Sequence, residues 1–226
     1  MSATIESAGT DTLSERAVGL VQRDILTGDL APGTRLGIVD LAKRYDIGAT
    51  PLREALSRLM SRGLIVGIGQ RGFRVAEISR ADLLDITQMR TVIEMEALQR
   101  SIANGDDAWE AGVLSALHRM RRHIERTGDA FHEGPDAFDA LHKGFHTSLL
   151  AACGSHRLLA AHADLYDQAY RYRRVMMRRM VGAAEFIASH QQLADCVLAR
   201  DVVRSRDMLT AHLRATLDFV YPTEPT

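Results

Sequence analysis

The chain has 226 residues, of which 46% are hydrophobic and 25% are charged, so it is long enough for one large or two modest globular domains. Its formal net charge of -1 indicates no general attraction to nucleic acids or anionic membranes. No apolar run reaches the roughly 18 to 20 residues of a membrane span, and residues 1–11 lack the basic start and apolar core of a secretion signal. We therefore expect a cytoplasmic protein in which Cys153 and Cys196 are unpaired thiols.

The first third of the chain predicts three helices and two short strands, at residues 12–27, 39–45, 50–61, 64–68 and 72–76. Gly28 is expected to end the first helix, and Thr50 to cap the third, with Pro51 at its first position. The strands are joined by a short glycine-rich turn, which is typical of a hairpin. Three helices followed by a two-stranded wing predict a winged helix-turn-helix domain.

The remainder has the periodicity of helices alone, and six are expected, at residues 80–103, 107–126, 135–152, 156–180, 183–200 and 201–220. The fold class is therefore mainly α, with a helical bundle after the winged domain. We expect a flexible start at 1–11, a DNA-binding domain at 12–78, an effector-binding domain at 79–220 and a tail at 221–226.

Charge is unevenly distributed, because residues 35–74 hold eight basic and three acidic side chains. Such a local basic face fits a phosphate footprint, although charged helices often simply face water. The helix at 50–61 is the one expected in the major groove, with Arg53 one turn from its start. Arg71, at the hairpin tip, is placed to approach the minor groove.

Ordered, ungapped motifs in this segment resemble the DNA-binding domain of GntR-family transcription regulators: Leu30-Ala-Pro-Gly-Thr-Arg-Leu36, Asp40-Leu-Ala42, Thr50-Pro-Leu-Arg-Glu-Ala-Leu56, Arg58-Leu59, Gly63-Leu64 and Arg71-Gly72. The resemblance and the expected elements together nominate six DNA-contacting residues, Arg35, Thr50, Arg53, Arg58, Arg71 and Gly72. Gly48-Ala49 replaces the Ser-Arg that the family usually carries, so the operator sequence stays open.

The helical remainder resembles the effector-binding FCD domain of the FadR subfamily, in its VanR-like branch. The motifs that carry this resemblance are Arg90-x-x-Ile-Glu94, Phe145-His146, His190, Arg200-Asp201 and His212. Many members of that family hold a divalent metal with one Asp and three His. The resemblance therefore implies a metal-assisted binding site for a small carboxylate.

Four histidines are the expected metal ligands. The resemblance nominates His146, His190 and His212, while His142 stands where the family has Asp. His142 and His146 are four residues apart, so they project from one helix face, although such pairs are also common on solvated helices. Asp139 is an alternative ligand or an outer partner of the site. An all-nitrogen site favours zinc or nickel over magnesium or calcium.

Arginines are the expected partners of the effector carboxylate, because guanidinium binds carboxylate through a two-pronged fork. Arg90 is the first candidate, and its alternative role is a surface ion pair with Glu94, one helical turn away. Arg171 and Arg174 are further candidates, although their arginine run is also typical of a solvated face. The five other histidines are expected on the surface or in ordinary hydrogen bonds (His118, His123, His132, His156 and His162).

These features predict a ligand-responsive regulator that binds a short inverted repeat as a homodimer. One alternative is a regulator in which the metal ion is itself the signal. A second is a metal-dependent hydrolase, since a histidine-bound ion can activate water. No H-E-x-x-H or similar base-bearing motif supports the hydrolase, which would also leave the winged domain unexplained.

Overall fold

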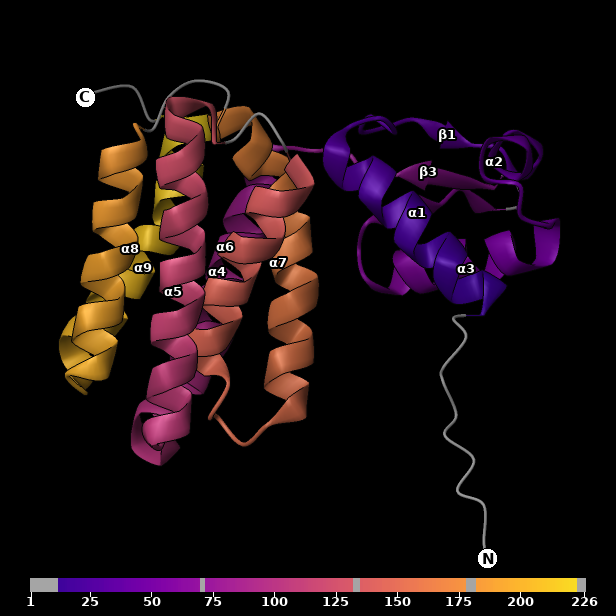
Figure 1. Cartoon of the computed structure of the whole chain (residues 1–226). Coiled ribbons are helices and arrows are strands. Elements are labelled where there is room, and N and C mark those ends of the chain that lie inside the picture. Colours follow the sequence, from indigo (N-terminus) through magenta and orange to yellow (C-terminus); the bar gives the residue numbers. More distant parts are fainter. Residues whose placement is uncertain (1–11, 70–71, 132–134, 178–181, 223–226) are drawn as a thin grey trace, which may run out of the picture. The chain divides into compact units, whose positions relative to one another are not determined.

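The computed structural model describes residues 12–69, 72–131, 135–177 and 182–222, with the backbone alone for 135–136 and 173–177. The chain forms two compact units, unit 1 (Met1–Glu77) and unit 2 (Ile78–Thr226), and each is considered by itself. Helices account for most of the described residues (Figure 1), so the predicted mainly α fold is confirmed.

Unit 1 is a winged helix-turn-helix domain, as predicted. Its elements are α1 (Leu13–Thr27), β1 (Arg35–Leu36), α2 (Ile38–Tyr45), α3 (Ala49–Ser61), β2 (Ile65–Gly67) and β3 (Phe73–Val75). The first helix begins at a reciprocal cap between Thr12 and Glu15 and ends at Gly28, whose φ of 82° suits glycine. The antiparallel sheet has the order β1-β3-β2. Strand β1 was not predicted, because two residues are too few to display alternation.

The start of α3 differs from the expectation. Gly48 is the capping residue and makes no side-chain cap, so Ala49 is the first helical residue and Thr50 the second. Pro51 then occupies the third position rather than the first. The proline is tolerated there because N–H groups in the first turn have no partner within the helix.

A buried carboxylate joins two helices of unit 1. Asp24 of α1 is only 2% exposed, and it accepts hydrogen bonds from the Tyr45 hydroxyl at 2.8 Å and from the Arg44 guanidinium at 2.6 Å. Burial and the bond to Asp24 raise the pKa of Tyr45 above its ordinary value. Tyr45 also belongs to the apolar core formed by all three helices and the sheet. Asp24 therefore fixes α2 against α1.

Unit 2 is a bundle of the six predicted helices, α4 (Arg80–Asn104), α5 (Asp107–Thr127), α6 (Pro135–Leu150), α7 (His156–Met177), α8 (Ala183–Leu198) and α9 (Val202–Val220). A short 3-10 turn follows α5. Helix α4 packs against α6, α7 and α9, while α5 packs against α6 and α8 (Figure 1). Several helices end one or two residues from the predicted positions, and the last expected turn of α7 lies outside the described residues. Among the described residues, no helix combines the length and apolarity needed to cross a membrane.

The Arg200-Asp201 motif has a structural role in the bundle. The Arg200 guanidinium donates to the carbonyl oxygens of Ile102 at 2.6 Å and Gly105 at 2.8 Å, at the end of α4. The Asp201 carboxylate accepts from the Arg204 backbone N–H at 3.0 Å and caps α9. The motif therefore joins the turn between α8 and α9 to the end of α4.

Candidate functional site

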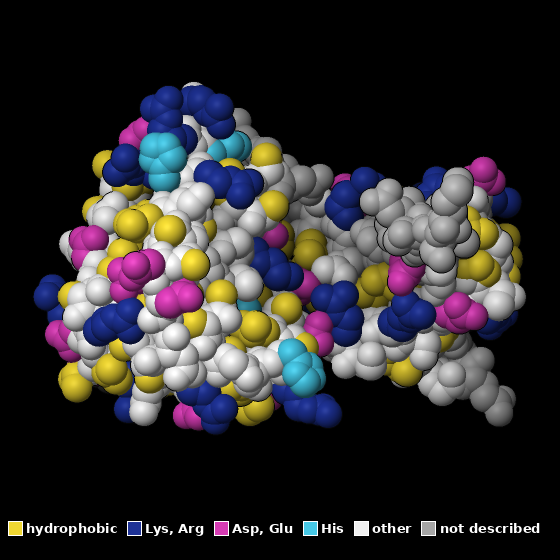
Figure 2. Space-filling view, turned by 60° about the horizontal axis from the view of Figure 1, so that its bottom comes forward, with side chains coloured by type: hydrophobic (Ala, Val, Ile, Leu, Met, Phe, Trp, Pro, Cys, Tyr) yellow, Lys and Arg dark blue, Asp and Glu magenta, His cyan; other side chains and the backbone are white. Residues whose placement is uncertain are grey.

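The expected DNA-binding side chains of unit 1 lie on the surface of α3 and at β1. Thr50, Arg53 and Arg58 of α3 are exposed, and so is Arg35 of β1. On the face shown in Figure 2, basic and acidic side chains are interspersed on both units. On this face charge alone does not mark a DNA-binding surface, and the assignment depends on the helix-turn-helix geometry.

Other basic residues of the same segment have partners inside unit 1. The Arg62 guanidinium donates to the Gln22 side chain at 2.6 Å, and that of Arg74 donates to the Gly33 carbonyl at 2.5 Å. With Arg44 paired to Asp24, three of the eight basic side chains hold the domain together. The local excess of charge is thus partly structural.

The wing hairpin closes through Gly72, whose carbonyl accepts from the Ile68 N–H at 2.8 Å. Its φ of 103° is one that side-chain-bearing residues rarely adopt. Arg71, expected at the hairpin tip, lies outside the described residues, so its DNA contact stays a prediction.

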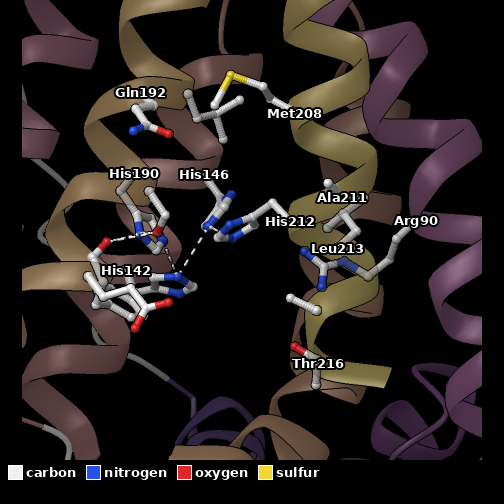
Figure 3. Close-up of a pocket in the computed structure, with 15 residues that line it drawn as sticks. Arg90, His142, His146, His190, Gln192, Met208, Ala211, His212, Leu213 and Thr216 are labelled. Atoms are coloured by element: carbon white, nitrogen blue, oxygen red, sulfur yellow. Dashed lines mark hydrogen bonds between the residues drawn. The ribbon is translucent and has the colours of Figure 1, made fainter. Parts of the chain in front are cut away.

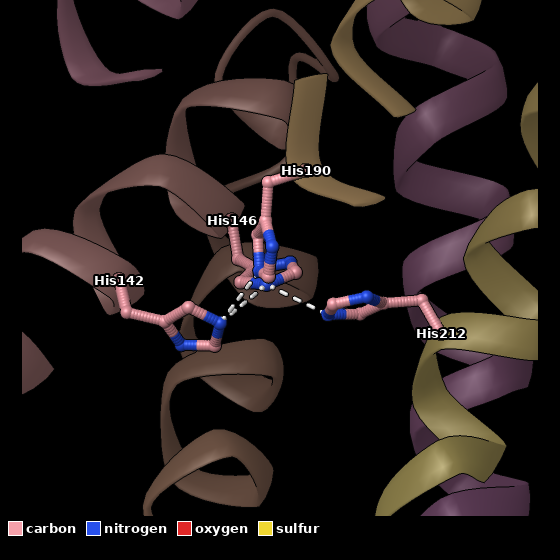
Figure 4. Close-up of side chains that lie close together, drawn as sticks. All are labelled: His142, His146, His190 and His212. Atoms are coloured by element: carbon pink, nitrogen blue, oxygen red, sulfur yellow. Dashed lines mark hydrogen bonds between the residues drawn. The ribbon is translucent and has the colours of Figure 1, made fainter. Parts of the chain in front are cut away.

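In unit 2, the four nominated histidines converge from three helices (Figure 4). His142 and His146 belong to α6, His190 to α8 and His212 to α9. The Nε2 atom of His142 lies 2.9 Å from that of His190 and 3.2 Å from that of His146, which is 3.2 Å from that of His212. One ligand atom from each residue lies within 4.8 Å of the others. We call these four residues the histidine cluster.

Groups around the cluster orient its rings. His190 Nδ1 lies 2.7 Å from the Phe186 carbonyl oxygen, which can only accept, so this nitrogen carries the proton and the Nε2 lone pair faces the cluster. His142 Nδ1 lies 2.6 Å from the Tyr166 hydroxyl, which in turn lies 3.3 Å from Asp139 Oδ1. Through these contacts Asp139 is linked to His142 by one intervening group, Tyr166, which fits the outer-partner alternative.

The cluster fits a divalent cation. Ligand nitrogens at 2.0–2.1 Å from one ion lie about 3–4 Å apart, close to the separations within the cluster. Three of the four rings are 1–2% exposed, and lone pairs facing one another at such distances repel unless a cation or a proton lies between them. Four imidazole nitrogens with no carboxylate among them suit a borderline metal such as zinc or nickel.

The histidine cluster opens into a cavity of about 350 Å³ in unit 2, which Arg90 of α4 also lines. In Figure 3 the Arg90 side chain extends from α4 toward the cavity. The rest of the lining is mixed, with apolar residues (Phe186, Leu193, Met208, Ala211, Leu213 and Ala215) and polar ones (Glu185, Ser189, Gln192 and Thr216). Such a mixture is typical of sites that bury a small molecule and hold its polar end.

Arg90 has both of its expected features, a place in the cavity and a bond to Glu94. Its Nε donates to Glu94 Oε1 at 2.7 Å, but the pair is buried rather than at the surface, with 6% and 1% exposure. Burial alone would raise the pKa of Glu94, but the charge of Arg90 and the nearby His162, with Nδ1 at 3.1 Å, hold it below its ordinary value. Glu94 therefore stays ionised and fixes Arg90 in the cavity wall.

Arg171, a second nominated arginine, does not line the cavity, and its guanidinium instead lies 3.9 Å from the Asp82 carboxylate and 5.9 Å from the centre of the Tyr172 ring. Periodicity does not say which face of α7 meets α4, so a contact of Arg171 with the effector stays a prediction. The Arg174 side chain lies outside the described residues.

Several residues of the site carry no signal in the sequence. Ser189, Gln192 and Thr216 line the cavity, and Tyr166 and His162 lie behind it. These contacts join helices far apart along the chain, so neither spacing nor composition points to them. His162 forms a hydrogen-bond contact with Thr147 at 3.4 Å, within the role expected of it.

Comparison with known proteins identifies the class as a DNA-binding transcription regulator. The family described as "Bacterial regulatory proteins, gntR family" matches residues 13–75, and the FCD domain matches residues 85–215. The chain belongs to the GntR family of transcription regulators and carries an FCD domain. Members of this family are regulators rather than enzymes, which removes the hydrolase alternative.

Individual relatives cover nearly the whole chain. The HTH-type transcriptional repressor GlaR of Escherichia coli (strain K12) is 38% identical over 204 residues, covering 88% of this chain and 92% of GlaR. The HTH-type regulator BphR of Paraburkholderia xenovorans (strain LB400) is 36% identical over 214 residues, covering 94% and 87%. The fold is similar to that of E. coli McbR/YncC, with a TM-score of 0.76, 20% identity and coverage of 94% and 98%.

Proposed function

We propose that unit 2 binds a small carboxylate metabolite beside a divalent metal ion, and that this binding sets the affinity of unit 1 for operator DNA. The observation that carries the proposal is the convergence of four histidine Nε2 atoms in the cavity that Arg90 also lines. A cationic centre and a guanidinium in one enclosed space suit an anion.

The side chains of the site have separate roles in this proposal. His142, His146, His190 and His212 hold the ion, which is zinc or nickel. When bound, the ion supplies positive charge and open coordination positions for an oxygen ligand. Arg90 donates hydrogen bonds to the carboxylate, and the apolar wall shields these bonds from water.

The DNA half of the proposal places α3 in the major groove and the wing beside it. A homodimer presents two such units to a short inverted repeat. The effector changes DNA affinity only to the extent that it binds one arrangement of the dimer more tightly than another. The nominated contacts are Thr50, Arg53 and Arg58 on α3, Arg35 on β1, and Arg71 with Gly72 in the wing.

Burial favours a resident ion over an ion that is itself the signal. Three of the four histidines are at most 2% exposed, and they come from different helices, so the ion is part of the packed bundle. Removing a resident ion is expected to lower the stability of unit 2.

A thermal-shift screen tests the proposal. The zinc-loaded protein is heated with sugar acids, hydroxy acids, dicarboxylates and fatty acids, each with and without a chelator. We expect one class to raise the melting temperature, and the chelator to abolish that rise. A rise that survives chelation would move the effector away from the histidines. DNA affinity that follows free zinc with no organic ligand would instead make the metal the signal.

A further inference from the structure

Tyr166 of α7 lies behind the cavity and contacts both a histidine of the cluster and Arg90. It is fully buried and does not line the cavity. Its hydroxyl oxygen lies 2.6 Å from His142 Nδ1, and its ring centre lies 5.5 Å from the Arg90 guanidinium carbon. One side chain therefore supports a ring of the histidine cluster and the arginine expected to bind the effector.

The protons available on Tyr166 and His142 determine which atom donates in each of these hydrogen bonds. The Tyr166 hydroxyl has a single hydrogen, which it donates to Asp139 Oδ1 at 3.3 Å. The hydroxyl oxygen must then accept the hydrogen carried by His142 Nδ1. A neutral imidazole has one N–H, so the Nε2 of His142 is left with its lone pair directed at the cluster.

We propose that Tyr166 is a positioning residue for the histidine cluster, holding His142 in the tautomer whose Nε2 can bind a metal ion. This inference rests on the proposed metal site of unit 2. A carboxylate needs no choice of tautomer, whereas an imidazole does, and the Asp139–Tyr166 pair makes that choice.

The test is the zinc affinity of the Tyr166→Phe protein, measured by competition with a chromogenic chelator. This change removes the hydroxyl and keeps the ring beside Arg90. Outer partners of metal-binding histidines typically contribute about 10–100-fold in affinity, and we expect a loss in that range. An affinity equal to that of the unmodified protein would overturn the inference.

Tyr172→Phe is the matched control on the same helix. Tyr172 is also fully buried, and its hydroxyl donates to Asp82 Oδ2 at 2.6 Å and accepts from the Ser79 N–H at 2.9 Å. It contacts no member of the histidine cluster in the described structure. We expect its loss to leave zinc affinity unchanged, and an equal fall in both variants would show a general effect of destabilising α7 and contradict the proposed role.

A second background separates positioning from structural support. In the His142→Ala protein, zinc is held by three histidines, and Tyr166→Phe should cause no further loss of affinity. A loss that persists at full size would mean that the hydroxyl acts on the bundle and not through His142. An unmodified protein that binds no zinc would overturn both the metal site and this inference, whereas tight binding unaffected by Tyr166→Phe would overturn the inference alone.

Discussion

The two units use buried polar groups for different purposes. In unit 1, Asp24 binds Arg44 and Tyr45 to join helices, and the side chains expected to touch DNA are exposed. In unit 2, the histidine cluster and the Arg90–Glu94 pair are buried around a cavity. The difference is the one expected under the proposed function, in which unit 1 meets a duplex at its surface and unit 2 encloses a small anion.

Breaking the buried Arg90–Glu94 pair of unit 2 should have the largest effect, a loss of unfolding free energy. Glu94→Gln leaves the Arg90 guanidinium without its buried counter-charge, and breaking such pairs costs about 3 kcal/mol or more of unfolding free energy. Urea unfolding followed by circular dichroism measures the loss. Arg100→Ala is the control, because its pair with Glu96 is about half exposed. Equal stability of the two variants would contradict the structural importance assigned to Glu94.

The same pair predicts a pH dependence of stability. The pKa of Glu94 is lower in the folded protein than in the unfolded chain, where it is about 4.3. Its contribution is therefore present above that unfolded value and is lost as the pH falls through the folded one. Between neutral pH and the acid range, stability should fall less steeply in Glu94→Gln than in the unmodified protein. Parallel curves of unfolding free energy against pH in the two proteins would contradict the lowered pKa assigned to Glu94.

Removing one metal-binding histidine should strongly lower the affinity for zinc. His190→Ala deletes a ring whose Nε2 lone pair is fixed by the bond from Nδ1 to the Phe186 carbonyl. We expect zinc affinity to fall by more than the roughly 10–100-fold typical of losing an outer partner. Metal content after dialysis against a dilute chelator measures this. His156→Ala, an exposed histidine of α7, is the control, and full occupancy in His190→Ala would remove His190 from the site.

Sequence reasoning succeeded where contacts are local. The winged domain follows from contiguous signals, such as Gly28 ending α1 and the glycine turn of the wing. A family resemblance nominates His146, His190 and His212, the i, i+4 spacing adds His142, and the structure brings all four together from three helices. The sequence carried no signal for the place of Arg171 beside Asp82 or for the contacts of Tyr166, because both depend on how α7 rotates against its neighbours. That rotation is set by packing among several helices that are apolar on more than one side.

In unit 1, truncating an exposed contact should impair function and spare the fold. Arg53→Ala removes a cation one turn into α3, and a specific base or phosphate contact is typically worth about 1–3 kcal/mol. Gel shifts with an operator selected from random-sequence DNA should show a fall in affinity of about 5- to 150-fold. Arg100→Ala in unit 2 should bind normally. Unchanged affinity in Arg53→Ala would contradict the placement of α3 in the groove.

The smallest effect is expected from removing one of the hydrogen bonds to the buried Asp24 of unit 1. Tyr45→Phe deletes the hydroxyl that donates to Asp24 at 2.8 Å, while Arg44 still pairs with that carboxylate. A loss of about 1 kcal/mol of unfolding free energy is expected. Thermal unfolding followed by circular dichroism measures it, and operator and zinc affinities should stay unchanged. A change in zinc affinity would contradict the separation of roles between the units.

The most direct test of the account is operator affinity with and without the carboxylate that the thermal-shift screen identifies, in zinc-loaded protein and in His190→Ala. The account predicts that the carboxylate changes DNA affinity in the zinc-loaded protein. It predicts that His190→Ala binds DNA with unchanged basal affinity but no longer responds. An equal response in both proteins would contradict the claim that the histidine cluster couples the effector to DNA binding.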